Sequence, residues 1–218
     1  MRKEVIVPDS LGEITLGQYQ KYLKIQADNE DEKFLAVKMV EIFCGIRGDL
    51  VMKMKATSIG DITSILASMF EQKPDLLKEF EMNGITYGFI PHLDDMSFGE
   101  YVDLDTYIGD TQNLHKAMGV LYRPIIQRYS NKYLIEEYKG EESDKMKNMP
   151  MDAVLGSMLF FYHLGMDLSK IMLNYLENNQ EENQNLVQHL SLGKNGGGIN
   201  RFSHSLNQIL QELKISLN

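Results

Sequence analysis

Cysteine and tryptophan are nearly missing from this chain of 218 residues, which has one cysteine and no tryptophan. The single cysteine, Cys44, cannot form an internal disulfide bond or supply a zinc site by itself, so a reducing compartment is expected. Cys44 ends the apolar stretch 37–44, where a free cysteine behaves as a small hydrophobic residue and burial makes the thiol less reactive. The sequence therefore gives no indication of thiol catalysis.

An excess of basic residues is also missing. The chain has 22 lysines and arginines against 31 aspartates and glutamates, which gives a formal net charge of -9. Because the acidic residues are spread along the chain, no basic face that would bind a nucleic-acid backbone is expected. The same charge suits a protein partner that carries a basic patch.

Long apolar runs are absent as well. No run approaches the roughly 20 apolar residues that a membrane-spanning helix needs. Residues 1–8 have a basic start without the apolar region of a secretory signal peptide. We therefore expect a cytosolic protein that makes no membrane contact.

The common catalytic and cofactor-binding motifs do not occur. The glycines at 196–198 lack the Lys-Ser/Thr of a phosphate-binding loop and the preceding strand of a dinucleotide-binding turn, and there is no Gly-x-Ser-x-Gly. No two histidines have the His-Glu-x-x-His spacing of a zinc-protease helix. The histidines are His92, His115, His163, His189 and His204. We predict a protein that is not an enzyme, with no catalytic residue, cofactor or metal site, and with helical histidines at surface or satisfied core positions.

One acidic segment, at residues 94–105, has two interpretations. Five carboxylates in a short span can hold a hard cation such as Mg²⁺ or Ca²⁺. Their spacing does not match an EF-hand loop, and apolar residues alternate with them, so a solvated face with acidic charge at a helix N-terminus is favoured. The five are Asp94, Asp95, Glu100, Asp103 and Asp105. Arg123, at a helix end before Pro124, can clamp one of these carboxylates, and an internal ion pair is favoured over a ligand site.

The most informative segment that is present surrounds Asn83-Gly84. This dipeptide favours a type I′ hairpin turn because both central residues of that turn need positive φ, and apolar residues flank it on both sides. Pro91 should end the second strand because it has no backbone N–H to donate. Ser97 and Glu100 then have capping-box spacing, which predicts the start of a short helix that runs through Tyr107.

Most of the remaining chain shows helical spacing of apolar residues. Helices are predicted at residues 15–25, 34–46, 58–73, 114–123 and 151–176. The helix at 34–46 is apolar on nearly all sides and is expected to be central, and Ser58 is expected to cap the third. Residues 4–7 and 133–138 are predicted as short extended segments, the first pairing with the hairpin, and 139–149 as a surface loop. The predicted fold is mainly α, a multi-helix bundle with a small antiparallel hairpin or sheet at about 80–91.

Fourteen methionines are unusual for a chain of this length. Methionine fills irregular gaps in cores and also forms adaptable binding surfaces. Core filling is the favoured interpretation.

The C-terminal part is predicted as a separate unit. Residues 1–193 form the helical domain, and 194–218 form an amphipathic helix attached through the glycine hinge at 196–198. Its apolar stripe has heptad-like spacing and needs a partner, because an isolated helix of this length is marginal in water. The predicted partner-binding residues are Phe202, Leu206, Ile209 and Leu213. Docking on a client, pairing with a second copy and folding back on the domain are all open, and an intermolecular contact is favoured.

Several segments resemble a group of proteins from tailed bacteriophages that act in virion morphogenesis. The resemblance spans about residues 10–165 and does not clearly cover the chain from Gln180 onward. The segments that carry it are 13–21, 87–91, 99–104, 115–124, 133–140 and 148–151. Tail assembly chaperones are the closest functional class within this group.

The resemblance implies a binding mechanism. A tail assembly chaperone covers apolar helices of a tail component, typically a tape-measure protein, until assembly displaces it. The partners implied are phage structural proteins, with a homo-oligomer as a further possibility, and the setting is the host cytoplasm during assembly. The alternative is a permanent virion component, such as a connector, neck or capsid-associated protein, and presence in purified particles separates the two.

Overall fold

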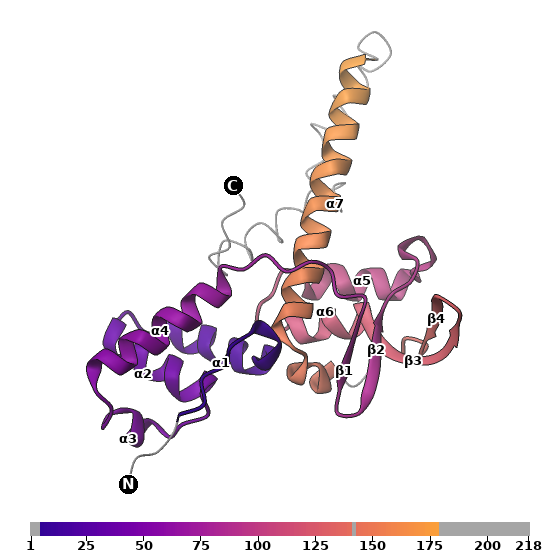
Figure 1. Cartoon of the computed structure of the whole chain (residues 1–218). Coiled ribbons are helices and arrows are strands. Elements are labelled where there is room, and N and C mark those ends of the chain that lie inside the picture. The colour runs from indigo at the N-terminus through magenta and orange to yellow at the C-terminus, as the bar shows by residue number, and fades with distance from the viewer. Residues whose placement is uncertain (1–4, 141–142, 179–218) are drawn as a thin grey trace.

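The computed structural model describes residues 5–140 and 143–178 (Figure 1). Within these residues the chain forms seven α-helices and one four-stranded antiparallel sheet, so the fold is mixed α and β and is not simply a helical bundle. Short 3-10 helices (η) lie at Leu11–Glu13, Leu93–Asp95 and Ser143–Asn148 (η1 to η3). The α-helices are α1 Leu16–Ala27, α2 Glu32–Phe43, α3 Gly48–Val51, α4 Ala56–Phe70, α5 Phe98–Tyr107, α6 Leu114–Leu121 and α7 Met151–Asn178. The strands are β1 Glu79–Met82, β2 Ile85–Phe89, β3 Tyr122–Tyr129 and β4 Lys132–Ile135.

Helices α1 to α4 gather on one side of the molecule (Figure 1). A capping box joins Thr15 and Gln18 at the start of α1, and the Asp31 side chain caps α2. Helix α1 begins one residue after the predicted start at 15, and α2 begins two residues before the predicted start at 34. The rings of Tyr19 and Phe43 both lie against Phe70 of α4, with centroids 4.9 and 5.3 Å away. These ring contacts tie the three longer helices together.

Two predictions about these helices are wrong. Helix α2 is not central, because only its last turn is buried and Phe34 in its first turn is exposed. Helix α4 begins at Ala56, with Lys55 as its N-cap residue, so Ser58 lies inside the helix and does not cap it. The apolar sequence of α2 was therefore not sufficient to place the whole helix in the core.

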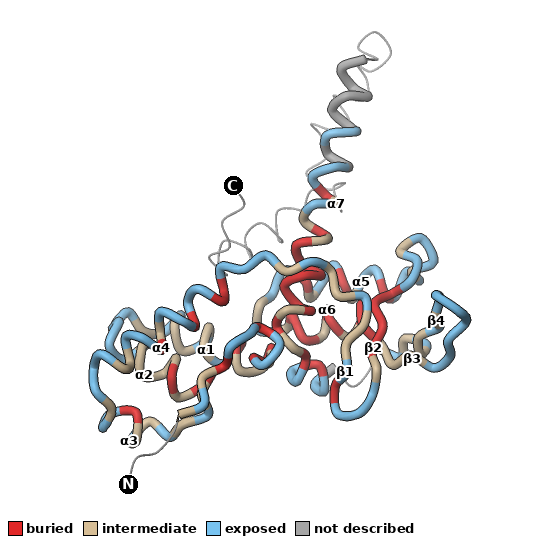
Figure 2. Tube along the Cα trace, viewed as in Figure 1, coloured by how far each residue is buried: buried red, intermediate tan, exposed pale blue. Residues whose placement is uncertain are grey.

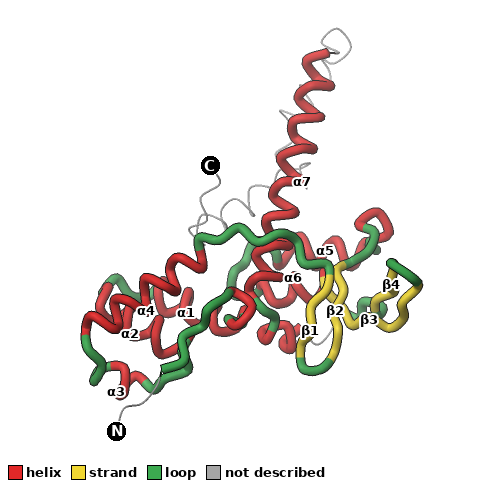
Figure 3. The backbone as a smooth tube through the Cα atoms, in the orientation of Figure 1, coloured by secondary structure: helices red, strands yellow, loops and turns green. Residues whose placement is uncertain are grey.

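The predicted hairpin is confirmed. Asn83 and Gly84 have φ of 53° and 74°, as a type I′ turn requires, and β1 pairs antiparallel with β2 on either side of them. The strand order in the sheet is β1-β2-β3-β4 (Figure 3). Helix α6 ends at Leu121, near the predicted position, but the chain then enters β3 directly, and this strand was not predicted. The extended segment at 133–138 contributes β4, which pairs with β3.

The N-terminal segment holds the start of α7 and does not add a strand to the sheet. Residues 5–7 have no regular secondary structure, so the predicted strand at 4–7 is wrong over its described part. Further along, the N–H of Leu16 donates to Met149 O and the N–H of Met151 donates to Ile14 O, both at 2.9 Å. Backbone hydrogen bonds therefore join the segment before α1 to the segment at the start of α7.

Methionine fills much of the core around this junction. Met146 and Met149 are fully buried, although the sequence predicted a surface loop at 139–149, and η3 occupies most of that segment. The other buried methionines are Met69, Met82, Met118, Met151 and Met158. The interpretation of methionine as core filling is thus supported, and the surface-loop prediction is corrected.

The first half of α7 runs between helices α1 to α4 on one side and α5, α6 and the sheet on the other (Figure 1). Phe160 and Phe161 pack against Phe89 of β2, with ring centroids 5.8 and 6.1 Å away. Gly156 lies against the loop before β1, where an added Cβ would stand 2.3 Å from Asp75 O. In the part of the chain that the structure describes, no helix is both long enough and apolar enough to cross a bilayer.

Candidate functional site

The second half of α7 leaves the body of the molecule (Figures 1 and 2). A helix of 28 residues rises about 1.5 Å per residue, and the body surrounds only its first turns. Burial is nearly continuous from Met151 to Phe161, whereas Met166 is 41% exposed and Ile171 is 64% exposed. The helix therefore presents apolar side chains to solvent on a projecting arm, defined here as residues 166–178.

Helix α5 presents a second apolar stripe. Phe98, Tyr101 and Val102 have the spacing of one helical face, and all three are exposed, Phe98 by 81%. The capping box of Ser97 and Glu100 fixes the first turn of the helix and so determines where Phe98 stands. Because Leu104 on the other face is buried, α5 has one face in the core and one apolar stripe in solvent.

An ion pair lies beneath α5. Arg123 Nη2 donates to Glu100 Oε1 at 2.7 Å, and the two side chains are only 12% and 9% exposed. Burial alone would raise the pKa of Glu100, but hydrogen bonds from Ser97 and the charge of Arg123 outweigh it and hold the pKa below its usual value. The predicted internal ion pair of Arg123 is confirmed.

The acidic segment is less solvated than predicted. Glu100 is buried, and Asp103 accepts a hydrogen bond of 2.6 Å from Tyr138 Oη, while Asp94, Asp95 and Asp105 are exposed. Among the described residues, no group of three or more histidines, cysteines, aspartates or glutamates could hold a metal ion. The segment therefore serves in part to attach α5 to the sheet.

His115 is a satisfied core histidine, as predicted. The Gln20 side chain of α1 donates to His115 Nδ1 at 3.2 Å, and His115 Nε2 lies 3.3 Å from Asp144 Oδ1 of η3. Cys44 is half-buried at the C-terminal cap of α2, and its burial raises the pKa of the thiol. Both residues are explained by their packing.

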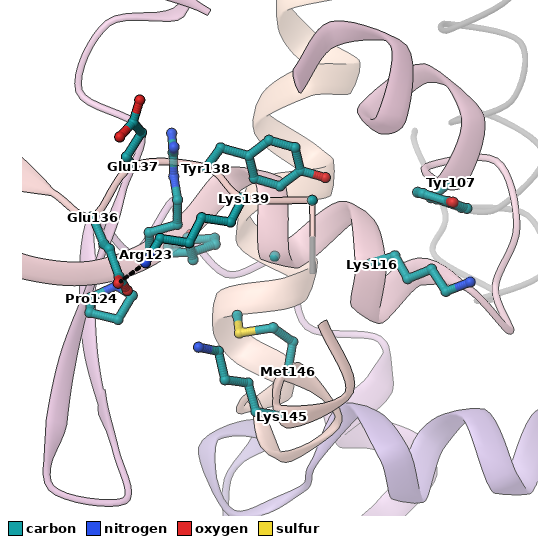
Figure 4. Close-up of a pocket in the computed structure, with 13 residues that line it drawn as sticks. Tyr107, Lys116, Arg123, Pro124, Glu136, Glu137, Tyr138, Lys139, Lys145 and Met146 are labelled. Carbon is teal, nitrogen blue, oxygen red and sulfur yellow. Dashed lines mark hydrogen bonds and ion pairs between the residues drawn. The ribbon is translucent and has the colours of Figure 1, made fainter. Parts of the chain in front are cut away.

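A pocket of about 340 Å³ opens between α6, the chain after β4 and η3 (Figure 4). Its charged lining residues are Lys116, Arg123, Lys139, Lys145, Glu136 and Glu137. Lys139 and Lys145 come from different segments, and Lys116 lies at the other end beside Tyr107 (Figure 4). Four cations and two carboxylates thus line one hollow, which gives it a positive balance in an acidic protein.

The residues predicted to bind a partner, Phe202, Leu206, Ile209 and Leu213, lie outside the described residues, as do the glycine hinge and the boundary at 193. The α5 stripe was missed, although its spacing of three and four was readable in the sequence. The pocket was missed because its cations come from separate segments of the chain. Comparison of the chain with family models, with curated proteins and with solved structures found no match.

Proposed function

We propose that this protein is a bacteriophage assembly protein that acts by protein–protein binding, and specifically a tail assembly chaperone. The observation that carries the proposal is the projecting arm of α7, where Met166 and Ile171 are exposed on the part of the helix that has left the body of the molecule. Its client is a tail component, with a tape-measure protein as the expected one, and it acts in the host cytoplasm during assembly.

The physical basis is helix recognition. An apolar helix face loses its contact with water when it packs against a second amphipathic helix, and about 25 cal/mol is gained for each Å² of apolar surface that becomes buried. The α5 stripe of Phe98, Tyr101 and Val102 supplies a second apolar surface of the same kind. The predicted stripe at Phe202, Leu206, Ile209 and Leu213 would follow the arm along the chain and extend the contact.

Co-expression with the tape-measure protein of the same phage tests this proposal. The unmodified chain should keep the client soluble and co-purify with it. The double variant Met166→Glu/Ile171→Glu should lose at least half of the captured client, because the charges oppose burial of the arm. Its melting temperature should be unchanged, since both side chains are exposed in the free protein.

The matched control changes polar residues on the same turns. Asp167 and Lys170 form an exposed ion pair, and Asp167→Asn/Lys170→Gln should leave capture intact. Equal capture by the glutamate variant and the control would reject the arm as the contact. Presence of the chain in purified particles in stoichiometric amount would instead favour the permanent virion component.

A further inference from the structure

The imidazole of His115 lies where three separate segments of the chain meet. The histidine belongs to α6, and its two ring nitrogens face Gln20 of α1 and Asp144 of η3. Only 4% of His115 and 5% of Gln20 is exposed, so water cannot readily replace either side chain as a hydrogen-bond partner. A change in the charge of this ring therefore acts directly on the contact of α1 with α6 and η3.

The hydrogen bonds around the ring require its neutral form. The amide nitrogen of Gln20 donates to the backbone oxygen of Thr111 at 2.7 Å, and a carbonyl oxygen only accepts, so the orientation of this amide is fixed. The same nitrogen lies 3.2 Å from His115 Nδ1, which must therefore be the unprotonated nitrogen. The proton of the neutral ring is then on Nε2, which lies 3.3 Å from Asp144 Oδ1.

A second proton on the ring conflicts with the Gln20 amide. With hydrogens on both ring nitrogens, His115 Nδ1 would face the amide nitrogen as donor against donor. Turning the amide by half a rotation would present its oxygen to the ring, but would then place that oxygen against the oxygen of Thr111. In either arrangement α1 loses a buried hydrogen bond to residues 111–115.

The effect is confined to the middle of α1 by the other bonds of this helix. Gln112 Nε2 donates to the backbone oxygen of Gln20 at 3.1 Å, so the segment that bonds to the Gln20 side chain also bonds to its backbone. The start of the helix is held separately, because the N–H of Leu16 donates to Met149 O at 2.9 Å. Loss of the Gln20 contact therefore loosens one side of α1 and leaves its first turn attached.

The charges around the ring decide the direction of the pH dependence. Burial first, then Lys147 of η3 and Lys116 of α6, lower the pKa of His115, and Asp144 of η3 opposes them. A hydrogen bond from Lys147 lowers the pKa of Asp144, which stays ionised in mild acid. An opened junction returns His115 to water and to its ordinary pKa of about 6.5, so it binds a proton more readily than the closed one, and acid favours opening.

We propose that His115 is an acid-sensitive joint, at which protonation of the ring releases the Gln20 amide and loosens the contact of α1 with α6 and η3 while the sheet stays folded. The device needs no ligand, because the proton acts on a buried hydrogen-bond network whose partners come from three elements.

Hydrogen exchange of the full chain, measured by mass spectrometry at about pH 7.5 and about pH 5 and corrected for the intrinsic pH dependence of exchange, tests the proposal. Protection of α1 and of residues 111–121 should fall about fivefold or more between the two pH values, because opening becomes easier when His115 is protonated. Protection of the β1–β2 hairpin should change less than about twofold. His115→Gln should remove the difference between the two pH values.

Two surface variants should change the effect of acid in opposite directions. Asp144→Asn keeps an oxygen that accepts from the neutral ring but removes the charge that supports the protonated one, so the loss of α1 protection should grow about threefold. Lys147→Gln removes a cation that repels the protonated ring, so the loss should shrink by about the same factor. The two side chains are 81% and 45% exposed, and both variants should fold. Asp49→Asn, at an exposed site on α3, is the control and should leave the loss unchanged.

Three results would overturn the proposal. The first is equal loss of protection in α1 and in the β1–β2 hairpin, which would mean that acid unfolds the whole chain. The second is unchanged protection of α1 at the lower pH. The third is a change of the same sign in Asp144→Asn and Lys147→Gln. Because these two variants alter exposed side chains, they decide the matter even where His115→Gln does not fold.

Discussion

The Glu100 carboxylate joins the start of α5 to the start of β3 through its contact with Arg123. Its Oε1 accepts from Arg123 Nη2 at 2.7 Å, and its Oε2 accepts from the backbone N–H of Ser97 at 2.7 Å. One buried side chain therefore completes a helix cap and an ion pair to the sheet. This arrangement fixes the helix whose outer face carries the apolar stripe of Phe98, Tyr101 and Val102.

Glu100→Gln should lower the free energy of unfolding by about 2–3 kcal/mol, because it leaves the buried Arg123 without its counter-charge. Urea denaturation followed by circular dichroism measures the change. Asp49→Asn breaks the exposed pair with Arg47 and should cost no more than about 0.5 kcal/mol. Similar small losses in both variants would show that the buried pair contributes little.

Stability should fall as the pH drops below about 6.5, the ordinary pKa of histidine. Burial first, and then the nearby charge of Lys147, lower the pKa of His115, while Asp144 opposes them. Between the lowered pKa and the ordinary value the unfolded chain binds more protons than the folded one, so acid favours unfolding and stability is complete above this window.

The contribution of His115 is isolated by comparing two variants. His115→Gln should show a smaller loss of unfolding free energy between about pH 7.5 and pH 5 than the unmodified chain. His163, which is exposed on α7, provides the control, and His163→Gln should keep the full loss. Unchanged pH dependence in His115→Gln would assign the effect to other groups.

Gly156→Ala should destabilise the protein by about 2 kcal/mol, since its Cβ would stand 2.3 Å from Asp75 O and the backbone must shift. Gly60→Ala, inside α4 with nothing within 4 Å of the added Cβ, should instead stabilise by about 0.5–1 kcal/mol through helix propensity. Thermal melting of the two variants gives opposite shifts if the close approach is real. A stabilised Gly156→Ala would contradict the packing of α7 against this loop.

Gly84→Val should cost roughly 1–2 kcal/mol, because a β-branched residue is strained at a φ of 74°. Asn83→Gly tests the neighbouring turn position, where glycine also accepts positive φ, and should change stability by no more than about 0.5 kcal/mol. Chemical denaturation measures both. A Val variant as stable as the unmodified chain would argue against the type I′ turn.

The features that were predictable from the sequence depend on a few neighbouring residues. The turn at Asn83-Gly84 and the capping box at Ser97 and Glu100 each involve at most four successive positions. Their chemistry is decided locally, so they do not require knowledge of distant contacts. The same holds for the end of α6, where Pro124 prevents the helix from continuing.

The features that were missed depend on distant partners. Met149 is buried because the segment at residues 14–16 bonds to the backbone around it, and nothing near residue 149 in sequence indicates this. Strand β3 forms because β2 pairs with it, and only its first two residues, Tyr122 and Arg123, fell within a predicted element, the helix at 114–123. Phe34 was assigned to a central helix, but it is 38% exposed in the first turn of α2.

The central claim is that the projecting arm of α7 contacts an assembly client. The most direct measurement is photo-crosslinking in infected cells with Ile171→benzoylphenylalanine, and with Gln72→benzoylphenylalanine at an exposed control position after α4. We expect crosslinks from position 171 to a tape-measure protein before tail completion, few from position 72, and none in finished particles. Equal crosslinking from both positions, or crosslinks from position 171 that persist in purified particles, would contradict it.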